Sequence, residues 1–401
     1  MSNLVHKSIT GTTAVKIASQ IEDAVRDGHL QPGDRLPAVR DLASSLGVSP
    51  ATVASAYQSL QARAVVVAHR RRRTRITHKP MAAARRRRAI ARGIIDLSDG
   101  NPDPALLPPV DAILRKLKYK PLLYGCDFVH EGLIDLMRRE MKSDGVDVGK
   151  LTVVNGTMDG LDRLITEHLR PGDRVAVEDP GFTGHHDLIA SRGLTLVPVR
   201  IDEQGMLPDS LERACVEGVH AVLITLRAQS PTGAAVTPQR AAELRNVLRR
   251  RPDALVIEDD HLSFLCDEPC ACVHASSVSR WVHFRSFSKS FNPDLRVAVM
   301  TGDDRTMTAL IDRLIVVERW VSHVLQCIAY ELLADKSIRA HIRKAGRIYD
   351  ERREDLMTLL RAAGFRPTGR TGYNLWLPVQ EETPIVQALS NNGFAVAAGE
   401  R

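Results

Sequence analysis

The sequence predicts an α/β protein in two parts, a small helical module at the N-terminus and a large domain of alternating strands and helices. In the second part, four short apolar runs each end in a polar turn, at residues 175–177, 221–226, 256–257 and 281–287. Runs of this kind indicate buried, mostly parallel strands. The segment 307–363 has a helical pattern. The charge is also divided, because residues 1–93 contain 17 Lys and Arg against 5 Asp and Glu, a balance of +12 in a chain of net charge +7.

The composition excludes several classes of protein. With 401 residues, of which 44% are apolar, the chain is long enough for two or three packed domains. No run of 18 apolar residues predicts a membrane helix, and residues 1–6 do not resemble a secretory signal. Of the six cysteines only Cys270 and Cys272 are close, a poor spacing for zinc without a second pair. We therefore expect reduced thiols, no metal site and a cytoplasmic protein.

The basic N-terminal part begins with two helices. Residues 13–26 have apolar positions at helical spacing, and Asp27 and Gly28 end the pattern. After a connector rich in turn residues, Pro37 suits the first turn of a second helix over 38–46, which Gly47 ends.

A third helix follows over residues 50–63, with Ser49 as its N-cap. Val53, Ala56 and Leu60 should pack inward. Two short helices joined at a glycine are typical of a helix-turn-helix, whose last helix enters the major groove of DNA.

The candidate DNA contacts lie on these helices and on a following hairpin. Residues 64–68 and 74–77 should form a wing with residues 69–73 at its tip. Four consecutive arginines repel one another unless phosphates are present, which favours DNA, although a merely solvated tip is the alternative. The candidates are Arg40, Ser49, Thr52, Tyr57, Arg71, Arg72 and Arg73. Residues 79–93 form a basic linker without apolar periodicity.

Lys289 is the centre of the predicted chemistry in the large domain. It follows the apolar run 281–287, so its amine can be partly desolvated, with a lowered pKa, and attack a carbonyl group. Ser286 and Arg296 flank it with a hydroxyl and a fixed cation, which suit a phosphate. A surface lysine after an edge strand is the alternative interpretation.

Two upstream segments strengthen this interpretation. Asp259 ends a predicted strand 30 residues before Lys289, where a carboxylate can keep a pyridine nitrogen protonated. Gly156, Thr157 and Met158 open a helix after a strand over 151–154, and free N–H groups there suit a phosphate. An ordinary helix N-cap would have the same appearance.

These motifs together resemble a known family. Residues 94–401 resemble the fold-type I aminotransferases, which bind pyridoxal 5′-phosphate (PLP), and residues 36–43 resemble the Leu-Pro-x-x-Arg-x-Leu-Ala pattern of GntR-type regulators. The combination is similar to the MocR subgroup. It implies a winged helix-turn-helix over 10–78, a linker over 79–93, and an α/β domain over 94–401 with a mixed, mostly parallel sheet, helices on both faces and a small, shortened C-terminal domain.

The resemblance also assigns residues to the PLP site. Lys289 would hold PLP as a Schiff base, Asp259 would meet the ring nitrogen, and Phe182 would stack on the ring. His261 stands where most of the family has a tyrosine, and Ser230 replaces the usual asparagine. A further list of cofactor contacts comprises Gly156, Thr157, Met158, Ser286, Arg296 and Tyr124, the last from the neighbouring subunit of a homodimer.

The resemblance implies a DNA-binding transcriptional regulator that senses PLP. The sequences of its motifs are similar to those of a regulator of vitamin B6 salvage. Its partners would be promoter DNA, PLP and a second copy of the chain. A working aminotransferase with an appended DNA-binding module is the alternative, and a DNA-binding protein that has lost PLP is a third. The altered His261 and Ser230 favour the regulator.

The end of the chain bears on the same choice. A small C-terminal domain should begin near Arg366, with residues 373–377 as its first strand. The sequence then stops at Arg401, before the family's strand with an arginine that grips the substrate carboxylate. We expect either a truncated product or a protein that binds no amino acid by that clamp.

Overall fold

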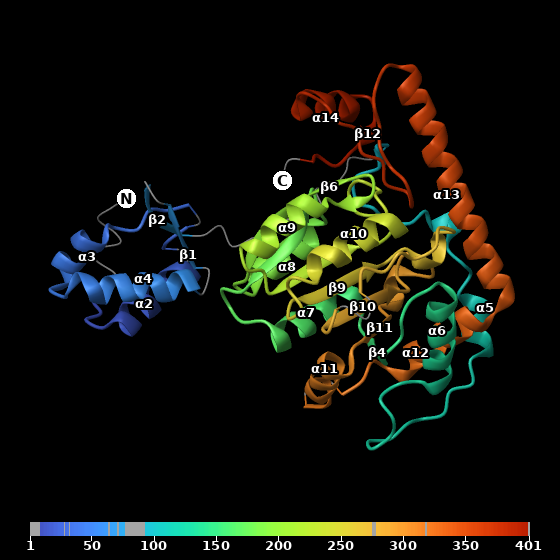
Figure 1. Ribbon diagram of the computed structural model, residues 1–401, viewed down its shortest axis with the longest axis horizontal. Helices are drawn as coiled ribbons and strands as arrows, with labels where there is room; N and C mark the ends of the chain where they lie inside the picture. The colour runs from blue at the N-terminus through green and yellow to red at the C-terminus, as the bar shows by residue number, and fades with distance from the viewer. Residues whose placement is uncertain are drawn as a thin grey trace. The chain divides into compact units, whose positions relative to one another are not determined.

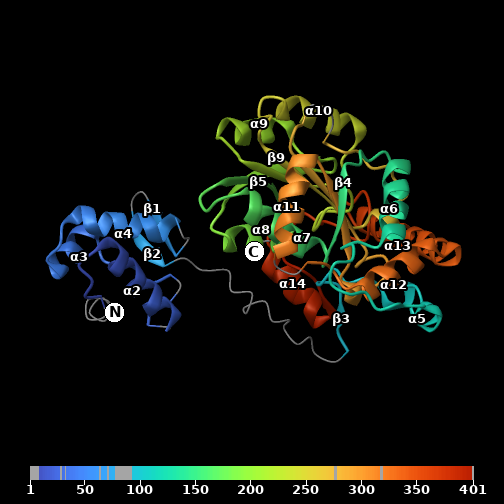
Figure 2. The same ribbon diagram turned by 90° about the horizontal axis from the view of Figure 1, so that it is seen from below.

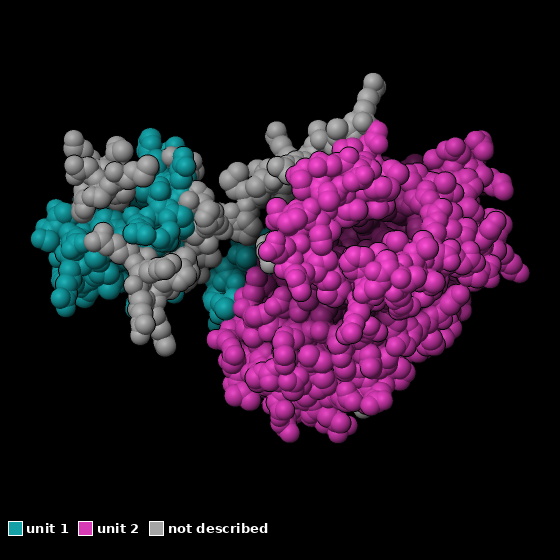
Figure 3. All heavy atoms as spheres, turned by 90° about the horizontal axis from the view of Figure 1, so that it is seen from above, with its two compact units in different colours: residues 1–88, 169–173, 187–195 teal, residues 89–168, 174–186, 196–401 magenta. Residues whose placement is uncertain are grey.

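The computed structural model describes residues 9–27, 29–31, 33–62, 65–69, 72–76, 93–274, 278–316 and 319–399. The chain divides into two compact units, coloured separately in Figure 3. The first contains residues 1–88, 169–173 and 187–195, and the second contains the remainder. Apart from Gly93, the predicted linker lies outside the described residues.

The first unit contains the three predicted helices and a hairpin. The elements are α2 (Ala14–Arg26), α3 (Val39–Leu46), α4 (Pro50–Ala62), β1 (Val66–His69) and β2 (Arg72–Ile76). Thr13 caps α2, because its hydroxyl accepts a hydrogen bond from the amide of Lys16 at 3.3 Å. Gly47 ends α3 with a φ of +63°, a conformation that favours glycine. The helix boundaries predicted from the sequence are therefore confirmed to within one residue.

The helices of this unit share one apolar core with the hairpin. Val53, Ala56 and Leu60 are fully buried, as predicted, and they pack in the same cluster as Ile17 and Ile76. Burial of this face fixes α4 against α2 and α3 and leaves its first turn at the surface.

The predicted tip of the wing is too long. His69 already pairs with Arg72, so both residues belong to the antiparallel ladder. Arg72 and Arg73 are consequently strand residues of β2, and Arg71 lies outside the described residues. The ladder is irregular between Val67 and His69, where its register shifts.

The second unit is built around an eight-stranded sheet (Figure 1), whose strand order is β4-β11-β10-β9-β8-β5-β6-β7. The strands are β4 (Lys150–Val154), β5 (Arg174–Asp179), β6 (Thr195–Asp202), β7 (Gly205–Met206), β8 (Ala221–Thr225), β9 (Leu255–Asp260), β10 (Trp281–Ser286) and β11 (Ala298–Gly302). The helices are α5 (Asp111–Lys116), α6 (Glu131–Ser143), α7 (Thr157–His168), α8 (Thr183–Ser191, of which residues 187–191 are counted with the first unit), α9 (Pro208–Val216), α10 (Pro238–Leu248), α11 (Asp304–Val316), α12 (His323–Ala334) and α13 (Lys336–Ala362), with short 3₁₀ turns at Pro104–Leu106, Ser263–Leu265 and Pro293–Leu295.

Strand direction decides which residues meet at one edge of the sheet. Strands β5, β8, β9 and β10 are parallel. Strand β11 is antiparallel to β10, and β4 is antiparallel to β11, so β4 runs in the same direction as β10. The carboxyl ends of these five parallel strands, and the beginning of β11, therefore lie at the same edge.

Helices cover both faces of this sheet. In Figure 2, α7 and α11 lie on one side of the strands near β4, and α6, α12 and α13 lie on the other. Gly160 allows α7 to approach closely, since a Cβ atom there would lie 2.6 Å from the ring of Phe284 in β10. The predicted helical segment 307–363 is confirmed as α11, α12 and α13.

The C-terminal part contains α14 (Glu382–Asn391) and β12 (Phe394–Ala395), which pairs in parallel with β3 (Ile95–Asp96). The strand predicted over 373–377 is wrong, because only Trp376 forms an isolated bridge, with Thr368. Gly372 has a φ of +73°, which turns the chain just before this segment. Within the described ranges we find no helix long and apolar enough to cross a membrane.

Candidate functional site

The predicted site residues gather at the carboxyl edge of the sheet. Thr157 follows β4, Phe182 follows β5, and Asp259 and Lys289 lie at or after the ends of β9 and β10. Arg296 precedes β11 at the same edge. Residues from five parts of the sequence thus converge where ligands of parallel α/β sheets bind.

A cradle for an anion lies between β4 and β11. Gly156 has a φ of +88°, and a Cβ atom there would lie 2.6 Å from Nη2 of Arg296. The exposed guanidinium of Arg296 donates a hydrogen bond to the carbonyl of Asn155 at 3.2 Å. Helix α7 begins at Thr157 and Met158, so its first-turn N–H groups point to the same place. A cation and a helix N-terminus together favour a phosphate.

Unsatisfied hydroxyl groups occur in the segments that follow β4 and β10. The hydroxyl oxygens of Thr157, Ser288 and Ser290 are buried and have no hydrogen-bond partner in the described part of the chain. Ser286 accepts a hydrogen bond from the amide of Ser288 at 3.2 Å, which leaves its own O–H free to donate. Arg296 has a φ of +48°, a left-handed conformation that is rare outside glycine and common at binding sites.

Asp259 is buried between two histidines. Its Oδ2 atom lies 3.5 Å from Nε2 of His185 and 3.3 Å from Nδ1 of His261. Among the described residues its Oδ1 atom has no hydrogen-bond partner. Burial acts to raise the pKa of Asp259, but His261 and then His185 outweigh it, so the pKa lies below its ordinary value. One carboxylate oxygen therefore remains available to a donor.

Sequence reasoning missed His185, which connects Asp259 with the predicted stacking residue. Phe182 packs edge-to-face on the His185 ring at 5.0 Å between centroids and is 41% exposed. Burial lowers the pKa of His185 to about 4, so its imidazole is neutral at pH 7. The pair of histidines just after Phe182 was the available signal in the sequence.

Lys289 is half-buried, and a neighbouring carbonyl holds its amine. Its Nζ atom donates to the carbonyl of Gly100 at 2.6 Å, and the Tyr373 hydroxyl donates to the same oxygen at 3.0 Å. Burial lowers the pKa of the Lys289 amine, while the charge of Asp99 opposes the shift. The amine is thus partly desolvated, as expected from its position after β10.

Next to Ser230, a second buried acid organises the turn after β8. Glu178 accepts hydrogen bonds from the amide and hydroxyl of Thr225, at 3.1 and 2.9 Å, and from the side chain of Gln229 at 3.2 Å. Burial raises the pKa of Glu178 to about 7. Ser230 itself is half-buried, and its predicted contact with the ring stays a prediction.

Tyr124 lies on the surface of the same unit. Its ring is 83% exposed, meets Trp320 at 5.7 Å between centroids and lies below the guanidinium of Arg319. Leu123 beside it is 79% exposed. Its predicted place in a neighbouring subunit's site stays a prediction.

In the helical module, the structure removes one predicted DNA contact. Tyr57 is buried, and its hydroxyl donates to the carbonyl of Pro37 at 3.0 Å. It shares the buried stripe of Val53, Ala56 and Leu60, because positions three and four apart lie on one helix face. Tyr57 is therefore a core residue and not a base contact.

The other predicted contacts of this module stay at the surface. Arg40 and Ser49 are exposed, and Thr52 is half-buried. Ser49 caps α4, because its oxygen accepts from the amide of Thr52 at 3.1 Å. The two hydroxyl oxygens also lie 2.9 Å apart. They mark the N-terminal turn of α4, the part of a recognition helix that meets bases and phosphates.

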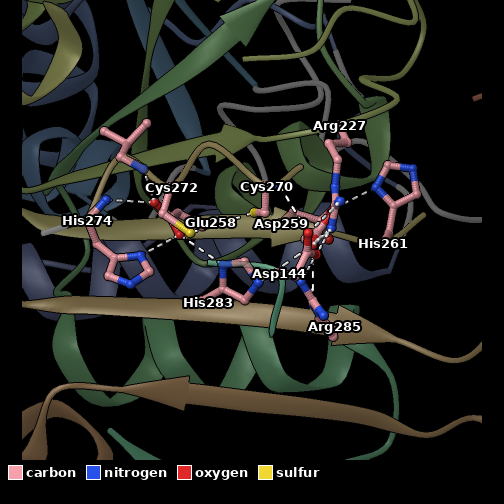
Figure 4. A network of polar contacts seen from close by, with 12 residues as sticks. Asp144, Arg227, Glu258, Asp259, His261, Cys270, Cys272, His274, His283 and Arg285 are labelled. Atoms are coloured by element: carbon pink, nitrogen blue, oxygen red, sulfur yellow. Dashed lines mark hydrogen bonds and ion pairs between the residues drawn. The ribbon is translucent and has the colours of Figure 1, made fainter. Parts of the chain in front are cut away.

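The opposite face of β9 holds a polar network that the sequence did not lead us to expect (Figure 4). Arg227 is 2% exposed and binds Asp260 with two hydrogen bonds, at 2.9 and 2.6 Å. It also reaches Asp144 at 2.8 Å, and Arg285 pairs with the same carboxylate. These four side chains pair with one another inside the domain, although among the described residues the buried Nε atom of Arg285 has no hydrogen-bond partner.

The comparisons with known proteins agree with the two-part architecture. Residues 13–76 match the family "Bacterial regulatory proteins, gntR family", and residues 115–400 match "Aminotransferase class I and II". The vitamin B6 salvage pathway transcriptional repressor PtsJ of Salmonella typhimurium is 36% identical over 393 residues, covering 98% of this chain and 91% of the relative.

Two further similarities concern the whole chain and the fold. The pyridoxine biosynthesis transcriptional regulator PdxR of Corynebacterium glutamicum is 26% identical, covering 96% of this chain and 87% of that protein. A Pyrococcus horikoshii kynurenine aminotransferase structure has a TM-score of 0.67 at 22% identity, covering 77% of this chain and 82% of that one. The latter likeness establishes the aminotransferase fold of the large unit.

Proposed function

This chain belongs to the MocR-type transcriptional regulators, in which a GntR-type DNA-binding module is joined to an aminotransferase-like domain, and from that premise we propose that it senses PLP and controls vitamin B6 salvage. Its relative PtsJ is named a repressor of that pathway. One observation supports this proposal most directly. The carboxyl edge of the sheet holds Lys289, Asp259 and the cradle formed by Gly156, Thr157 and Arg296.

The residues at this edge fit PLP. The Oδ1 atom of Asp259 can accept from a ring nitrogen, and the Thr157 hydroxyl can donate to a phosphate, since neither atom has a partner among the described residues. Arg296 adds a cation beside the N-terminus of α7. When bound, PLP supplies an aldehyde that a lysine amine can attack, and Lys289 has a partly desolvated amine for that purpose.

The protein's own groups would orient such a ligand in distinct ways. Phe182 lies at the carboxyl edge of the sheet, and its partly exposed ring is available for stacking on a ligand. His261 lies beside Asp259 and can donate to a ring oxygen through an imidazole N–H. Binding changes transcription only if PLP has different affinities for the DNA-competent and DNA-incompetent states.

We propose that the protein acts as a homodimer that exposes two DNA-binding modules. The support is the exposed apolar pair Leu123 and Tyr124 on the surface of the large unit. A second copy covering this segment would bring Tyr124 to the neighbouring site. Light scattering of the full chain should give twice the mass of 44.2 kDa, and a monomer at micromolar concentration would contradict this part.

The proposed function is tested by DNA binding with and without PLP. A duplex spanning the region upstream of the gene for this protein should bind the full chain, with an affinity that PLP changes several-fold. The Lys289→Ala variant should bind DNA without responding to PLP. No binding of the duplex in either state would contradict a regulatory role, and turnover of amino donors with keto acids would favour the enzyme instead.

A second arm tests the DNA-binding surface. Arg40→Ala removes an exposed cation next to the recognition helix. The affinity for DNA should therefore fall for all sequences, and the slope of log affinity against log salt concentration should become shallower by about 1. Arg249→Ala, an exposed arginine of the large unit, is the matched control and should change neither. Equal effects of both substitutions would show that only net charge matters.

A further inference from the structure

Four side chains of the types that can bind a metal ion meet on the face of β9 and β10 opposite Asp259. Glu258, Cys272, His274 and His283 each offer a ligand atom, and these atoms all lie within 4.8 Å of one another. Figure 4 shows Glu258 between the two imidazoles, with the Cys272 sulfur beside it. Thiolate, imidazole and carboxylate are the ligands that Zn²⁺ takes in proteins.

The fold places these residues by strand register and by one covering segment. His283 of β10 lies directly beside Glu258 of β9 in the parallel ladder. Cys272 and His274 come from the segment that returns over these two strands. Glu258 and His283 are fully buried and His274 is 3% exposed, whereas Cys272 is partly exposed. An ion could therefore enter from the side of Cys272.

The contacts of Glu258 already orient it as a ligand. Its Oε1 atom accepts from the amides of Val273 and His274, at 2.6 and 2.7 Å. Its Oε2 atom faces Nδ1 of His274 at 2.6 Å and Nδ1 of His283 at 2.9 Å. One oxygen is thus fixed by the backbone, and the other points to the middle of the cluster.

The outer contacts resemble those of a metal centre as well. The Nε2 atom of His283 lies 3.7 Å from the Asp260 carboxylate and has no hydrogen-bond partner among the described residues, so this carboxylate is near enough to accept from it after a small shift. The His274 ring stacks on Trp281 with 3.8 Å between centroids and an angle of 6°. Both imidazoles are held with Nδ1 turned toward Glu258.

Within the described residues, the ionic contacts of Glu258 are with His274 and His283 and not with an arginine or lysine. Asp144 and Asp260 are balanced by Arg227 and Arg285, with which they pair. Glu258 is thus a buried acid whose neighbours in this cluster are two histidines and a thiol. A buried charge needs a partner, because its transfer from water costs several kcal/mol.

We propose that Glu258, Cys272, His274 and His283 bind one Zn²⁺ ion, or a similar divalent transition metal, at a structural site. The carboxylate and the Cys272 thiolate would balance the charge of the ion, and the imidazoles would bind through Nδ1 in their neutral form. Tetrahedral Zn²⁺ with bonds of about 2.0–2.3 Å brings its ligand atoms to about 3.3–3.8 Å from one another. A small withdrawal of the Glu258 carboxylate would make this room.

Four protein ligands leave no open position, so the ion would tie the segment 270–274 to the sheet and not take part in chemistry. Binding would release the thiol proton and shift both imidazoles to the tautomer with hydrogen on Nε2. The inference is independent of PLP binding, since it concerns the other face of the strands.

The test uses the full chain, expressed in minimal medium with Zn²⁺ and purified without chelators. Elemental analysis should find one zinc per chain. After removal of the metal under reducing conditions, titration with Co²⁺ should give the visible bands of tetrahedral cobalt and a sulfur-to-cobalt charge-transfer band. A chain that retains no metal and gives no such bands contains an ion-free network with a protonated histidine, which would overturn the proposal.

Variants assign the ligands. Cys272→Ser should abolish the charge-transfer band and lower the zinc content to background, and His274→Gln should do the same for zinc. Cys215→Ser, which alters another buried thiol outside the cluster, should keep one zinc per chain. Retention of full zinc by Cys272→Ser would overturn the assignment. If that variant fails to fold, the cobalt spectrum of the unaltered chain still decides whether a thiolate binds the metal.

Discussion

The two faces of strand β9 differ in how their polar groups are satisfied. On one face Asp259 has a carboxylate oxygen with no hydrogen-bond partner in the described residues. On the other face the Asp260 carboxylate is bound by Arg227 and approached by Arg285 and His283. Neighbouring residues of one strand thus have opposite surroundings, because side chains alternate across a sheet.

This difference separates binding from structural roles. A buried polar atom without a partner costs free energy, and a fold keeps it where a ligand can satisfy it. A buried charge whose partners are all internal contributes to the fold only. The comparison therefore predicts distinct outcomes for substitutions that look alike in the sequence.

The largest effect is expected at Arg227. Arg227→Ala removes the two-bond partner of Asp260 and leaves Asp144 and Asp260 to share Arg285, so the free energy of unfolding should fall by about 3–5 kcal/mol. Urea unfolding of the full chain measures it. Arg200→Ala breaks an exposed pair with Asp209 and should cost no more than about 1 kcal/mol. Equal losses would show that burial of the network does not matter.

The two neighbouring aspartates sharpen the comparison. Asp260→Asn should cost about 3 kcal/mol in unfolding free energy, since it removes the fully buried carboxylate beside Arg227 and leaves that guanidinium paired with the half-buried Asp144. Asp259→Asn should change the stability of the PLP-free protein by less than about 1 kcal/mol, because an amide oxygen can keep the 3.3 and 3.5 Å contacts with His261 and His185 and no arginine is left without its partner. The same variant should weaken PLP binding. A reversed order of the two stability losses would refute the division of the faces.

Glu178 gives a pH dependence of known sign. Its pKa is about 7 in the folded chain, against 4.5 ordinarily, because it is buried. The folded state therefore binds more protons between these values, and stability should fall as pH rises from about 4.5 to 7, by about 3 kcal/mol. Unfolding at pH 5 and pH 8 measures it. Glu178→Gln should remove this loss, and a variant as pH-dependent as the original chain would contradict the assignment.

The smallest effect on stability is expected from replacing either of two glycines, which form a matched pair. Gly156 and Gly218 have φ values of +88° and +85°, so replacement of either by alanine should cost about 1–2 kcal/mol. Only at Gly156 would the new Cβ atom meet Arg296, at 2.6 Å, whereas nothing lies within 4 Å at Gly218. Gly156→Ala alone should weaken binding of PLP in spectroscopic titration. Equal PLP affinity in both variants would show that the cradle does not hold the phosphate.

Local signals were sufficient for the helical module and for the edge of the sheet. Thr13, Gly47 and Ser49 mark helix ends through their own backbone and side-chain contacts, and sequence therefore predicts those boundaries. Lys289 and Asp259 were found because they end apolar strands, which parallel topology brings to one edge. Tyr57 was misassigned although its spacing from Val53 and Leu60 already places it on the buried stripe.

The buried network could not be predicted, because its contacts depend on register between strands far apart in sequence. Arg227 meets Asp260 across neighbouring strands, and Asp144 reaches both arginines from the end of α6. One signal was available. His283 and Arg285 interrupt an otherwise apolar strand, and charged residues are seldom fully buried without partners.

The central claim is that Lys289 faces a ligand at the carboxyl edge of the sheet. Incubation of the full chain with PLP, borohydride reduction and mass analysis of its peptides tests this claim most directly. We expect one reduced PLP adduct per chain, on the peptide containing Lys289, and none after Lys289→Ala. Labelling spread over surface lysines, or no adduct at Lys289, would contradict the account.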